Sequence, residues 1–236
     1  MNTAPVGCLR REYFVQENEG SLHILITGVG RGIGRAMAIE ALARGWQVSG
    51  TVRQSGDAPQ GAQELLADMR DRDRLRAIGA KLGPVDVLIN NAGVIGPERQ
   101  ATLDMDYDGF AETFLVNTLA PLAMAQAVLP QMPGGGRILT ISSQMAWMGY
   151  AKSDRIAYRA SKAAVNKVMQ GLATDLHDRR IAVAQIDPGW VRTDMGGAEA
   201  DEDPTQVARG ILDIASTLDM SGTGRFLRWT GEERDF

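Results

Sequence analysis

Two side chains that could transfer a proton, a tyrosine and a lysine, lie four residues apart. Tyr158 and Lys162 fall in a segment with helical periodicity, so this spacing puts both on one face of a helix. A free tyrosine has a pKa of about 10 and is therefore a poor base at pH 7, whereas a nearby ammonium favours the phenolate. The pair predicts a general acid/base. The alternative is an ordinary surface pair.

A serine and an asparagine could complete such a site. Ser143 follows a strand expected at 137–142, where its hydroxyl could donate to a substrate oxygen as that oxygen gains charge. Ser142 is the alternative, although its side chain should point to the opposite face of the strand. Asn117 lies four residues before Pro121, which has no N–H to give to the carbonyl of Asn117. We expect that carbonyl to be free to hold a water at a helical kink.

A glycine-rich turn follows the first expected strand. From Thr27 to Gly34 the pattern is T-G-x-x-x-G-x-G, and the fingerprint G-x-G-x-x-G does not fit because Ile33 stands where its last glycine is needed. Glycines at a strand-to-helix turn let backbone approach a pyrophosphate and point the helix N-terminus at it. The turn indicates nucleotide binding. The alternative is a tight strand–helix connection.

The elements that must position these residues alternate along the chain. Short apolar runs predict strands at 22–27, 46–52, 63–67, 85–90, 137–142, 181–186 and 224–228. Helical periodicity predicts helices at 32–44, 71–82, 106–131, 156–177 and 204–218. This alternation predicts an α/β fold, a single-domain Rossmann-type doubly wound parallel sheet of about seven strands with helices on both faces. We expect the domain to span 22–236 and residues 1–21 to form a flexible N-terminal arm.

Composition excludes several classes of function. With 25 Lys and Arg against 29 Asp and Glu among 236 residues, the net charge of −4 gives no electrostatic support for nucleic-acid binding. One cysteine and two histidines argue against a disulfide framework, a zinc cluster or a Ser-His-Asp hydrolase. Because no signal-peptide core and no continuous apolar run of about 18 residues stands out, we expect a cytoplasmic protein without a membrane span.

Four motifs in this order resemble the short-chain dehydrogenase/reductase family. They are the turn at 27–34, Asn90-Asn91-Ala92-Gly93, the run 158–162 and Asp187-Pro-Gly-Trp-Val-Arg-Thr193. The runs 158–166, 194–197 and 224–227 are similar to its C-factor-like carbonyl reductase branch. The resemblance implies an oxidoreductase in which Tyr158 is the general acid/base, Lys162 holds the nicotinamide ribose, Ser143 polarises the substrate and Asn117 anchors a relay water. The commonest family spacing would place the serine at Met145, so we expect a two-residue insertion within 144–156.

The resemblance also implies a cofactor. An acidic residue near Val52 would hold the adenosine ribose in this family, and a valine there leaves a 2′-phosphate unopposed. Arg31 and Arg53 could bind that phosphate, so we expect NADP(H), preferred over NAD(H). The alternative is two solvated arginines. No metal is expected. The other expected cofactor contacts are Gly28, Gly32, Ile33, Gly34, Asp68, Met69, Asn90, Ala92, Gly93, Tyr158, Lys162, Pro188, Gly189, Val191 and Thr193.

The expected substrate is a small carbonyl or alcohol compound. Segments 94–101, 145–155 and 190–203 should face it, and their apolar members fit either a substrate pocket or ordinary loop packing: Met145, Trp147, Met148, Tyr150, Trp190 and Met195. One alternative is a 3-oxoacyl-[acyl-carrier-protein] reductase with a basic docking patch at Arg155, Arg159 and Arg192. Another is a dinucleotide-binding signalling protein of C-factor type with incidental catalysis. The resemblance further implies a homodimer or homotetramer through helices 106–131 and 156–177.

Overall fold

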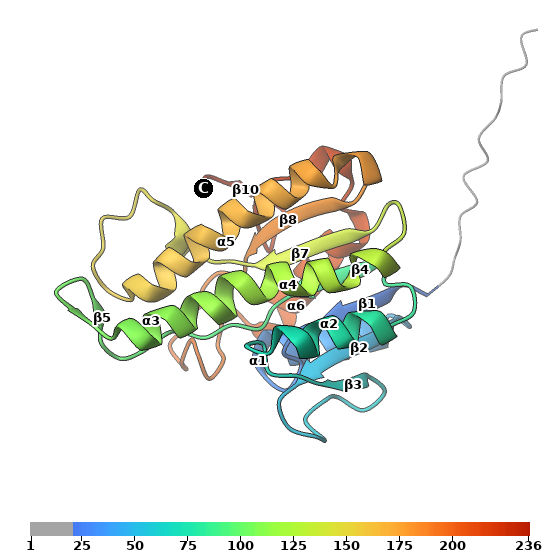
Figure 1. Cartoon of the computed structure of the whole chain (residues 1–236), viewed down its shortest axis with the longest axis horizontal. Coiled ribbons are helices and arrows are strands. Elements are labelled where there is room, and N and C mark those ends of the chain that lie inside the picture. The colour runs from blue at the N-terminus through green and yellow to red at the C-terminus, as the bar shows by residue number, and fades with distance from the viewer. Residues whose placement is uncertain (1–20) are drawn as a thin grey trace, which may run out of the picture.

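The computed structural model describes residues 21–236, which build one eight-stranded sheet with helices on both faces (Figure 1). The expected N-terminal arm lies, apart from Ser21, outside the described residues. Along the sheet the order is β10-β9-β8-β7-β4-β1-β2-β3, and only β10 runs antiparallel to its neighbour. The strands are β1 (His23–Ile26), β2 (Gln47–Val52), β3 (Gln63–Leu66), β4 (Val87–Asn90), β7 (Arg137–Ile141), β8 (Ala182–Asp187), β9 (Phe226–Arg228) and β10 (Glu233–Arg234).

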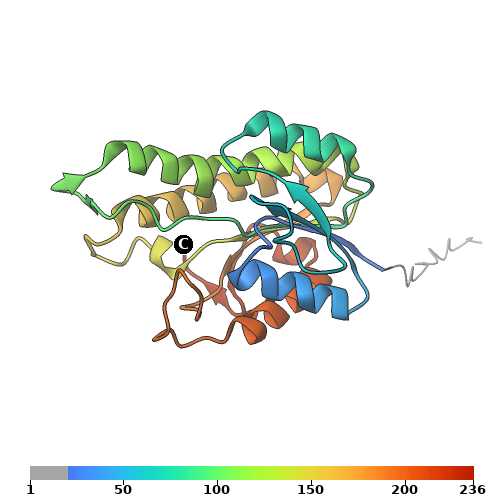
Figure 2. The same cartoon turned by 90° about the horizontal axis from the view of Figure 1, so that it is seen from below.

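The helices form two layers, one on each face of this sheet (Figure 2). Helices α1 (Gly32–Ala43) and α6 (Pro204–Thr217) cover one face, and α2 (Arg72–Lys81), α4 (Ala120–Val128) and α5 (Ile156–Asp175) cover the other. Because successive strand residues point to opposite faces, Ile24 and Ile26 enter the first core and Leu25 enters the second. Strands buried on both faces read as continuous apolar runs, which confirms the predicted doubly wound parallel sheet.

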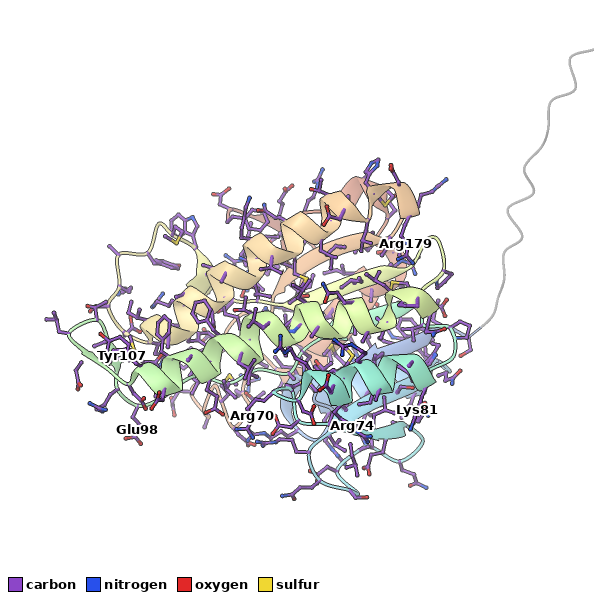
Figure 3. The ribbon with its side chains drawn as sticks, in the orientation of Figure 1. Arg70, Arg74, Lys81, Glu98, Tyr107 and Arg179 are labelled. Carbon is purple, nitrogen blue, oxygen red and sulfur yellow. The ribbon has the colours of Figure 1, made fainter. Side chains whose placement is uncertain are left out.

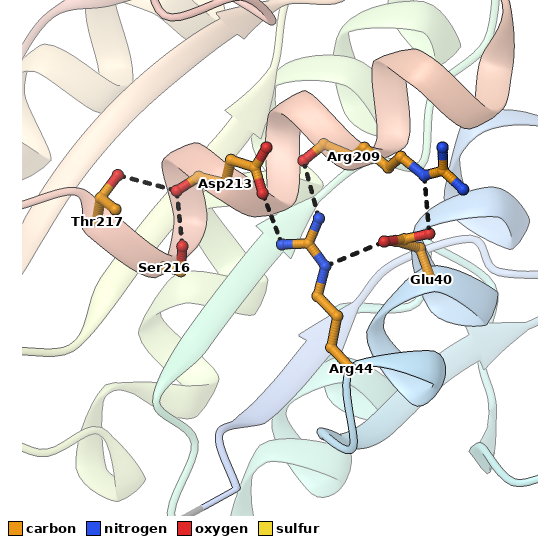
Figure 4. A network of polar contacts seen from close by, with 6 residues as sticks. All are labelled: Glu40, Arg44, Arg209, Asp213, Ser216 and Thr217. Carbon is orange, nitrogen blue, oxygen red and sulfur yellow. Dashed lines mark hydrogen bonds and ion pairs between the residues drawn. The ribbon is translucent and has the colours of Figure 1, made fainter. Parts of the chain in front are cut away.

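A polar network holds α1 against α6 at the surface (Figure 4). The Arg44 guanidinium donates to Oε1 of Glu40 at 3.2 Å and lies 2.8 Å from Oδ1 of Asp213. Arg209 on α6 donates to the other oxygen of Glu40, also at 3.2 Å. These bonds at the edge of the apolar contact fix how α6 lies beside α1, whose N-terminus begins at the glycine turn.

The chain changes direction across the sheet between β1 and β4. After β1 it builds β2 and β3 on one side, and then crosses to build β4 and β7 on the other side. Crossovers to both sides leave a crevice beyond the carboxyl ends of these central strands, where ligands bind in open α/β sheets. The glycine turn at 27–34 and the segment 90–93 both lie at this edge.

The helix predicted at 106–131 is interrupted around Asn117, where the sequence predicts a kink. It consists of α3 (Tyr107–Phe114), a π-helical turn (Leu115–Leu119), α4 and a 3₁₀ turn (Leu129–Gln131). In the π turn the N–H of Ala120 bonds to the carbonyl of Leu115, five residues back, and Pro121 follows directly. The segment as a whole is long and apolar enough to cross a membrane, but half of its most apolar stretch is buried in this domain.

Two short pairings were not predicted. Strands β5 (Gln100–Ala101) and β6 (Asp104–Met105) form an antiparallel hairpin, and Tyr107 lies beside it at the outer end of α3 (Figure 3). Strand β10 adds an eighth strand to the expected seven or so. Each of these three strands is two residues long, too short for a periodic pattern in the sequence.

Candidate active site

The glycine turn is fixed by bonds to β2 and to the segment after β4. The N–H groups of Gly28 and Val29 donate to the carbonyl of Thr51 at 3.1 and 3.0 Å. The hydroxyl of Thr27 accepts from the N–H groups of Asn91 and Ala92 at 2.9 and 3.0 Å. Two strands that are distant in sequence therefore hold the turn from both sides.

Glycine is required at two positions of this turn for different reasons. Gly28 has φ +76°, a conformation that side chains rarely adopt. A Cβ on Gly34 would lie 2.1 Å from the carbonyl oxygen of Gly28 and 2.4 Å from Nδ2 of Asn91. The first turn of α1 thus packs directly on the β1 end, with its free N–H groups facing the crevice.

A cavity of about 890 Å³ opens at this edge of the sheet. It collects residues from the glycine turn, from the ends of β2, β3, β4, β7 and β8, and from the start of α5. Sixteen predicted site residues line it: Gly28, Arg31, Gly32, Ile33, Arg53, Asp68, Met69, Ala92, Gly93, Ser143, Tyr158, Lys162, Pro188, Gly189, Val191 and Thr193. The other three predicted residues, Gly34, Asn90 and Asn117, lie behind its wall.

Tyr158 and Lys162 lie together in the cavity wall, as their spacing predicts. The Lys162 Nζ is 5.6 Å from the centre of the Tyr158 ring, and it donates to the carbonyl of Ile141 at 2.7 Å. Burial raises the pKa of Tyr158 to about 12, against a smaller lowering by a hydrogen bond with Ser143. Burial also lowers the pKa of Lys162 to about 8. With the protein's own groups alone, burial therefore outweighs the phenolate stabilisation expected from the lysine.

The two candidate serines differ in what their hydroxyls contact. Ser143 lies beside Tyr158 and its Oγ accepts from the N–H of Met145 at 3.1 Å, at the start of a short 3₁₀ turn. The Oγ of Ser142 is buried without a hydrogen-bond partner among the described residues. Residues 144–155 connect these serines to α5. Within this connection the rings of Trp147 and Tyr150 pack edge to face, with 4.9 Å between their centres.

Asn117 acts through its side chain on the loop that follows β4. Its Oδ1 accepts from the N–H of Val94 at 2.9 Å, and its Nδ2 donates to the carbonyl of Val94 at 2.8 Å and to Oγ of Ser161 at 3.0 Å. A Cβ on Gly93 would lie 3.2 Å from Oδ1 of Asn117 and 3.6 Å from Nζ of Lys162. The π turn thus places this amide next to the lysine, separated from it by a glycine.

Charged groups at the other end of the cavity are partly paired. Arg31 forms an ion pair with Asp194 at 2.9 Å, and both side chains are well exposed. Arg70, beside the start of α2 (Figure 3), bonds to both oxygens of Asp68 and lies 2.9 Å from Glu112. This contact lowers the pKa of Asp68. Among residues 21–236, Arg53 forms no ion pair, although its charge adds to the lowering of the Asp68 pKa. It is therefore the expected phosphate ligand that no ion pair holds in place.

Three site residues were missed by sequence reasoning. Asn91 lines the cavity and donates to the carbonyls of Thr27 and Gly28 at 2.8 and 3.2 Å. The buried Asp187 accepts from the N–H groups of Gln144 and Gly189, each at 3.0 Å. Gln100, on the β5–β6 hairpin, accepts from the N–H of Tyr158 at 3.2 Å. Asn91 and Asp187 lie within the motifs at 90–93 and 187–193, so these motifs could have indicated them. Gln100 lies in no motif, and no pattern in the sequence indicates it.

Only some of the aromatic and Met residues that were expected to face the substrate line the cavity. Met145, Trp190 and Met195 line the cavity, whereas Trp147, Met148 and Tyr150 do not. In the described part of the chain, no cluster of three or more His, Cys, Asp or Glu side chains could hold a metal ion.

Comparison with known proteins gives the family. The sequence profile described as "short chain dehydrogenase" matches residues 22–204. The chain belongs to the short-chain dehydrogenase family. Within it, the chain is similar to C-signal of Myxococcus xanthus, 41% identical over 155 residues that make up 64% of this chain and 92% of that protein. This likeness agrees with the C-factor-like branch predicted from the sequence.

Solved structures of family members have the same fold. A short-chain dehydrogenase/reductase from Burkholderia multivorans with bound NADP superposes with a TM-score of 0.83 and 29% identity, over 92% of this chain and all of that one. The NADPH-bound carbonyl reductase from chicken fatty liver superposes with a TM-score of 0.82 and 25% identity, over 92% of this chain and 99% of that one. The predicted family and fold are both confirmed.

Proposed function

We propose that this family member is an NADP(H)-dependent reductase of small ketones or aldehydes, or catalyses the reverse oxidation. The observation that carries the proposal is one cavity that holds Ser143, Tyr158 and Lys162 at one end and a glycine turn with Arg31 and Arg53 at the other. The glycine turn lines this cavity, and two related NADP-bound structures share the fold. Such a nucleotide supplies or accepts the hydride.

Tyr158 is the group that we assign to the proton. With its pKa raised to about 12, the phenol is protonated at neutral pH and can donate to an oxygen that gains charge. Ser143 hydrogen-bonds to the same phenol and can donate to the same substrate oxygen. Lys162 is held by the Ile141 carbonyl with hydrogens left over for ribose hydroxyls. Asn117 fixes the Val94 loop beside the lysine, where a relay water would lie.

Preference for NADP(H) over NAD(H) is part of the proposal. Val52 and Arg53 stand together at the end of β2 beside the cavity, and Val52 takes the place of the acidic residue that would repel a 2′-phosphate in this family. Arg31 reaches the phosphate only if it exchanges Asp194 for that phosphate. A higher kcat/KM with NADPH than with NADH supports this choice, and a preference for NADH contradicts it.

The remaining assignments follow the family. We propose a homodimer or homotetramer through α3–α4 and α5, which analytical ultracentrifugation can test. The substrate is a small carbonyl or alcohol compound that contacts Met145, Trp190 and Met195.

The test is turnover of a panel of ketones and aldehydes, followed by the absorbance of NADPH. Wild type should reduce members of the panel. Tyr158→Phe should lower kcat by roughly 10²-fold or more, because a positioned acid contributes about 10²–10⁴-fold. The Kd for NADPH, measured by its fluorescence, should change only a few-fold. A Tyr158→Phe variant that keeps its kcat would remove the assignment.

A signalling function is the second candidate, favoured by the 41% identity with C-signal. Signalling would then require nucleotide binding but no catalytic turnover, so a cellular effect that survives Tyr158→Phe would support a signalling function.

A 3-oxoacyl-carrier-protein reductase is less well supported. Two of the three arginines expected to dock the carrier are already engaged, Arg159 with Asp154 and Arg192 with the carbonyls of Ala200 and Asp201.

A further inference from the structure

The helix that carries Tyr158 has no side-chain cap of its own. Arg155 precedes α5 in a left-handed conformation, φ 51°, and makes no capping hydrogen bond. The first N–H groups of a helix lack partners within it and need others, particularly when they are buried. The N–H of Tyr158, at the third position of α5, finds its partner 58 residues away, in Oε1 of Gln100 at 3.2 Å. Gln100 is buried, with 7% of its surface exposed.

The other end of the same amide holds the cavity wall. Nε2 of Gln100 donates to the carbonyl of Ile95 at 3.1 Å and to that of Pro97 at 2.7 Å. Both hydrogens of the amide are therefore used. Gly96 lies between these carbonyls with φ +90°, and a Cβ there would lie 3.1 Å from Oε1 of Gln100. The turn at 95–97 therefore packs closely on the side chains of Gln100 and Thr113.

The wall that Gln100 holds is a wall of the site itself. Val94 and Ile95 line the cavity, and Asn117 binds both backbone groups of Val94. The loop is thus attached to the π turn by Asn117 and to α5 by Gln100. Because Gln100 bonds to the backbone of the tyrosine, its attachment sets the distance between the Tyr158 backbone and this wall.

We propose that Gln100 is a positioning residue for Tyr158, which fixes the phenol relative to the Val94–Ile95 wall against which the reacting groups lie. The proposal rests on the function proposed above. A misplacement of about 1 Å in a reacting group can cost roughly 10²-fold in rate. A positioning role therefore predicts a loss in kcat, whereas nucleotide binding, which depends mainly on the opposite end of the cavity, should change little.

The first variant is Gln100→Leu, which removes both the acceptor and the donors while it conserves size. We expect kcat to fall roughly 10- to 100-fold, with the Kd for NADPH within about threefold of wild type. The matched control is Gln206→Leu, at an exposed glutamine on α6, which should retain wild-type kinetics. Far-UV circular dichroism shows whether each variant is folded. A folded Gln100→Leu variant whose kcat stays within twofold of wild type overturns the proposal.

Gln100→Glu supplies a readout that a simple loss of stability would not give. A buried carboxyl has a raised pKa, and its protonated form can still accept from Tyr158 and donate to one carbonyl. When it ionises, it turns a carboxylate oxygen toward the carbonyls of Ile95 and Pro97. We therefore expect kcat near that of wild type at low pH and a loss as pH rises, at pH values where the fold and wild-type kcat hold. If kcat of the Gln100→Glu variant follows the same pH profile as that of wild type, the proposal is contradicted. This test stands even where the Gln100→Leu variant does not fold. Failure of wild type to turn over any carbonyl removes the proposed function instead.

Discussion

Replacing Lys162 by methionine should remove a pH dependence of stability that its burial creates. The side chain is buried, with 4% of the residue exposed, and burial lowers its pKa from 10.5 to about 8. Between these values the unfolded chain binds more protons than the folded one, so the wild-type free energy of unfolding gains a term that rises with pH. Each pKa unit corresponds to about 1.4 kcal/mol, which gives about 3 kcal/mol between pH 8 and 10.5.

The assay is urea unfolding followed by circular dichroism at several pH values from 7 to 10.5. Lys162→Met keeps the length of the side chain but cannot titrate. From pH 8 to 10.5, the free energy of unfolding of wild type should therefore rise by about 3 kcal/mol relative to that of the variant. The control is Lys167→Met at an exposed position of α5, for which the difference from wild type should not change with pH in this way. If the Lys162→Met difference is also flat, the reasoning that burial depresses this amine is wrong.

Two further predictions concern the nucleotide end of the cavity. Arg53→Glu should lower the ratio of kcat/KM for NADPH to that for NADH by roughly 10- to 100-fold, because one charge-assisted hydrogen bond contributes about 1.5–3 kcal/mol; an unchanged ratio would exclude Arg53 as a phosphate ligand. Gly34→Ala should weaken NADPH binding and destabilise the fold, since its Cβ would meet the Gly28 carbonyl at 2.1 Å. Its control, Gly171→Ala on an open face of α5, should instead raise the free energy of unfolding by about 0.5–1 kcal/mol in urea titrations. Equal effects of the two alanines would contradict this reading of the turn.

The regular elements could be predicted because their residues carry a periodic signal. The runs at 22–27 and 85–90 are apolar on both faces, and β1 and β4 lie within them. Asp203 and Pro204 begin α6 as a capping pair, with Oδ1 of Asp203 accepting from two N–H groups. The β5–β6 hairpin could not be found in this way, because two-residue strands have no period and their pairing depends on contacts made after folding.

The sequence predicts site residues well where a motif specifies both the residue type and its position on an element. It predicts them less well where the face of the sheet to which a side chain points decides whether it reaches the site. Asn90 stays a predicted cofactor contact through its backbone, since its side chain continues the alternation of Leu88 toward the α4 side and bonds to the carbonyl of Pro121 at 3.3 Å. The next residue, Asn91, faces the cavity instead. The alternation of side chains along β4 could have indicated that Asn90 and Asn91 point to opposite faces of the sheet. The Arg31–Asp194 pair could not have been found, since it joins residues 163 positions apart.

The pKa values of Tyr158 and Lys162 indicate how the pair handles its proton. The sequence predicts that the ammonium of Lys162 stabilises a phenolate at Tyr158. Burial, however, favours the neutral form of each group: it raises the pKa of the phenol to about 12 and lowers the pKa of the amine to about 8. Two groups shifted in this way do not form an ion pair at neutral pH, and the phenol keeps its proton. The protein's own groups therefore prepare Tyr158 as a donor, which is the role required for reduction of a carbonyl. Oxidation of an alcohol needs the proton to leave first, so its rate should rise with pH over a range in which reduction does not.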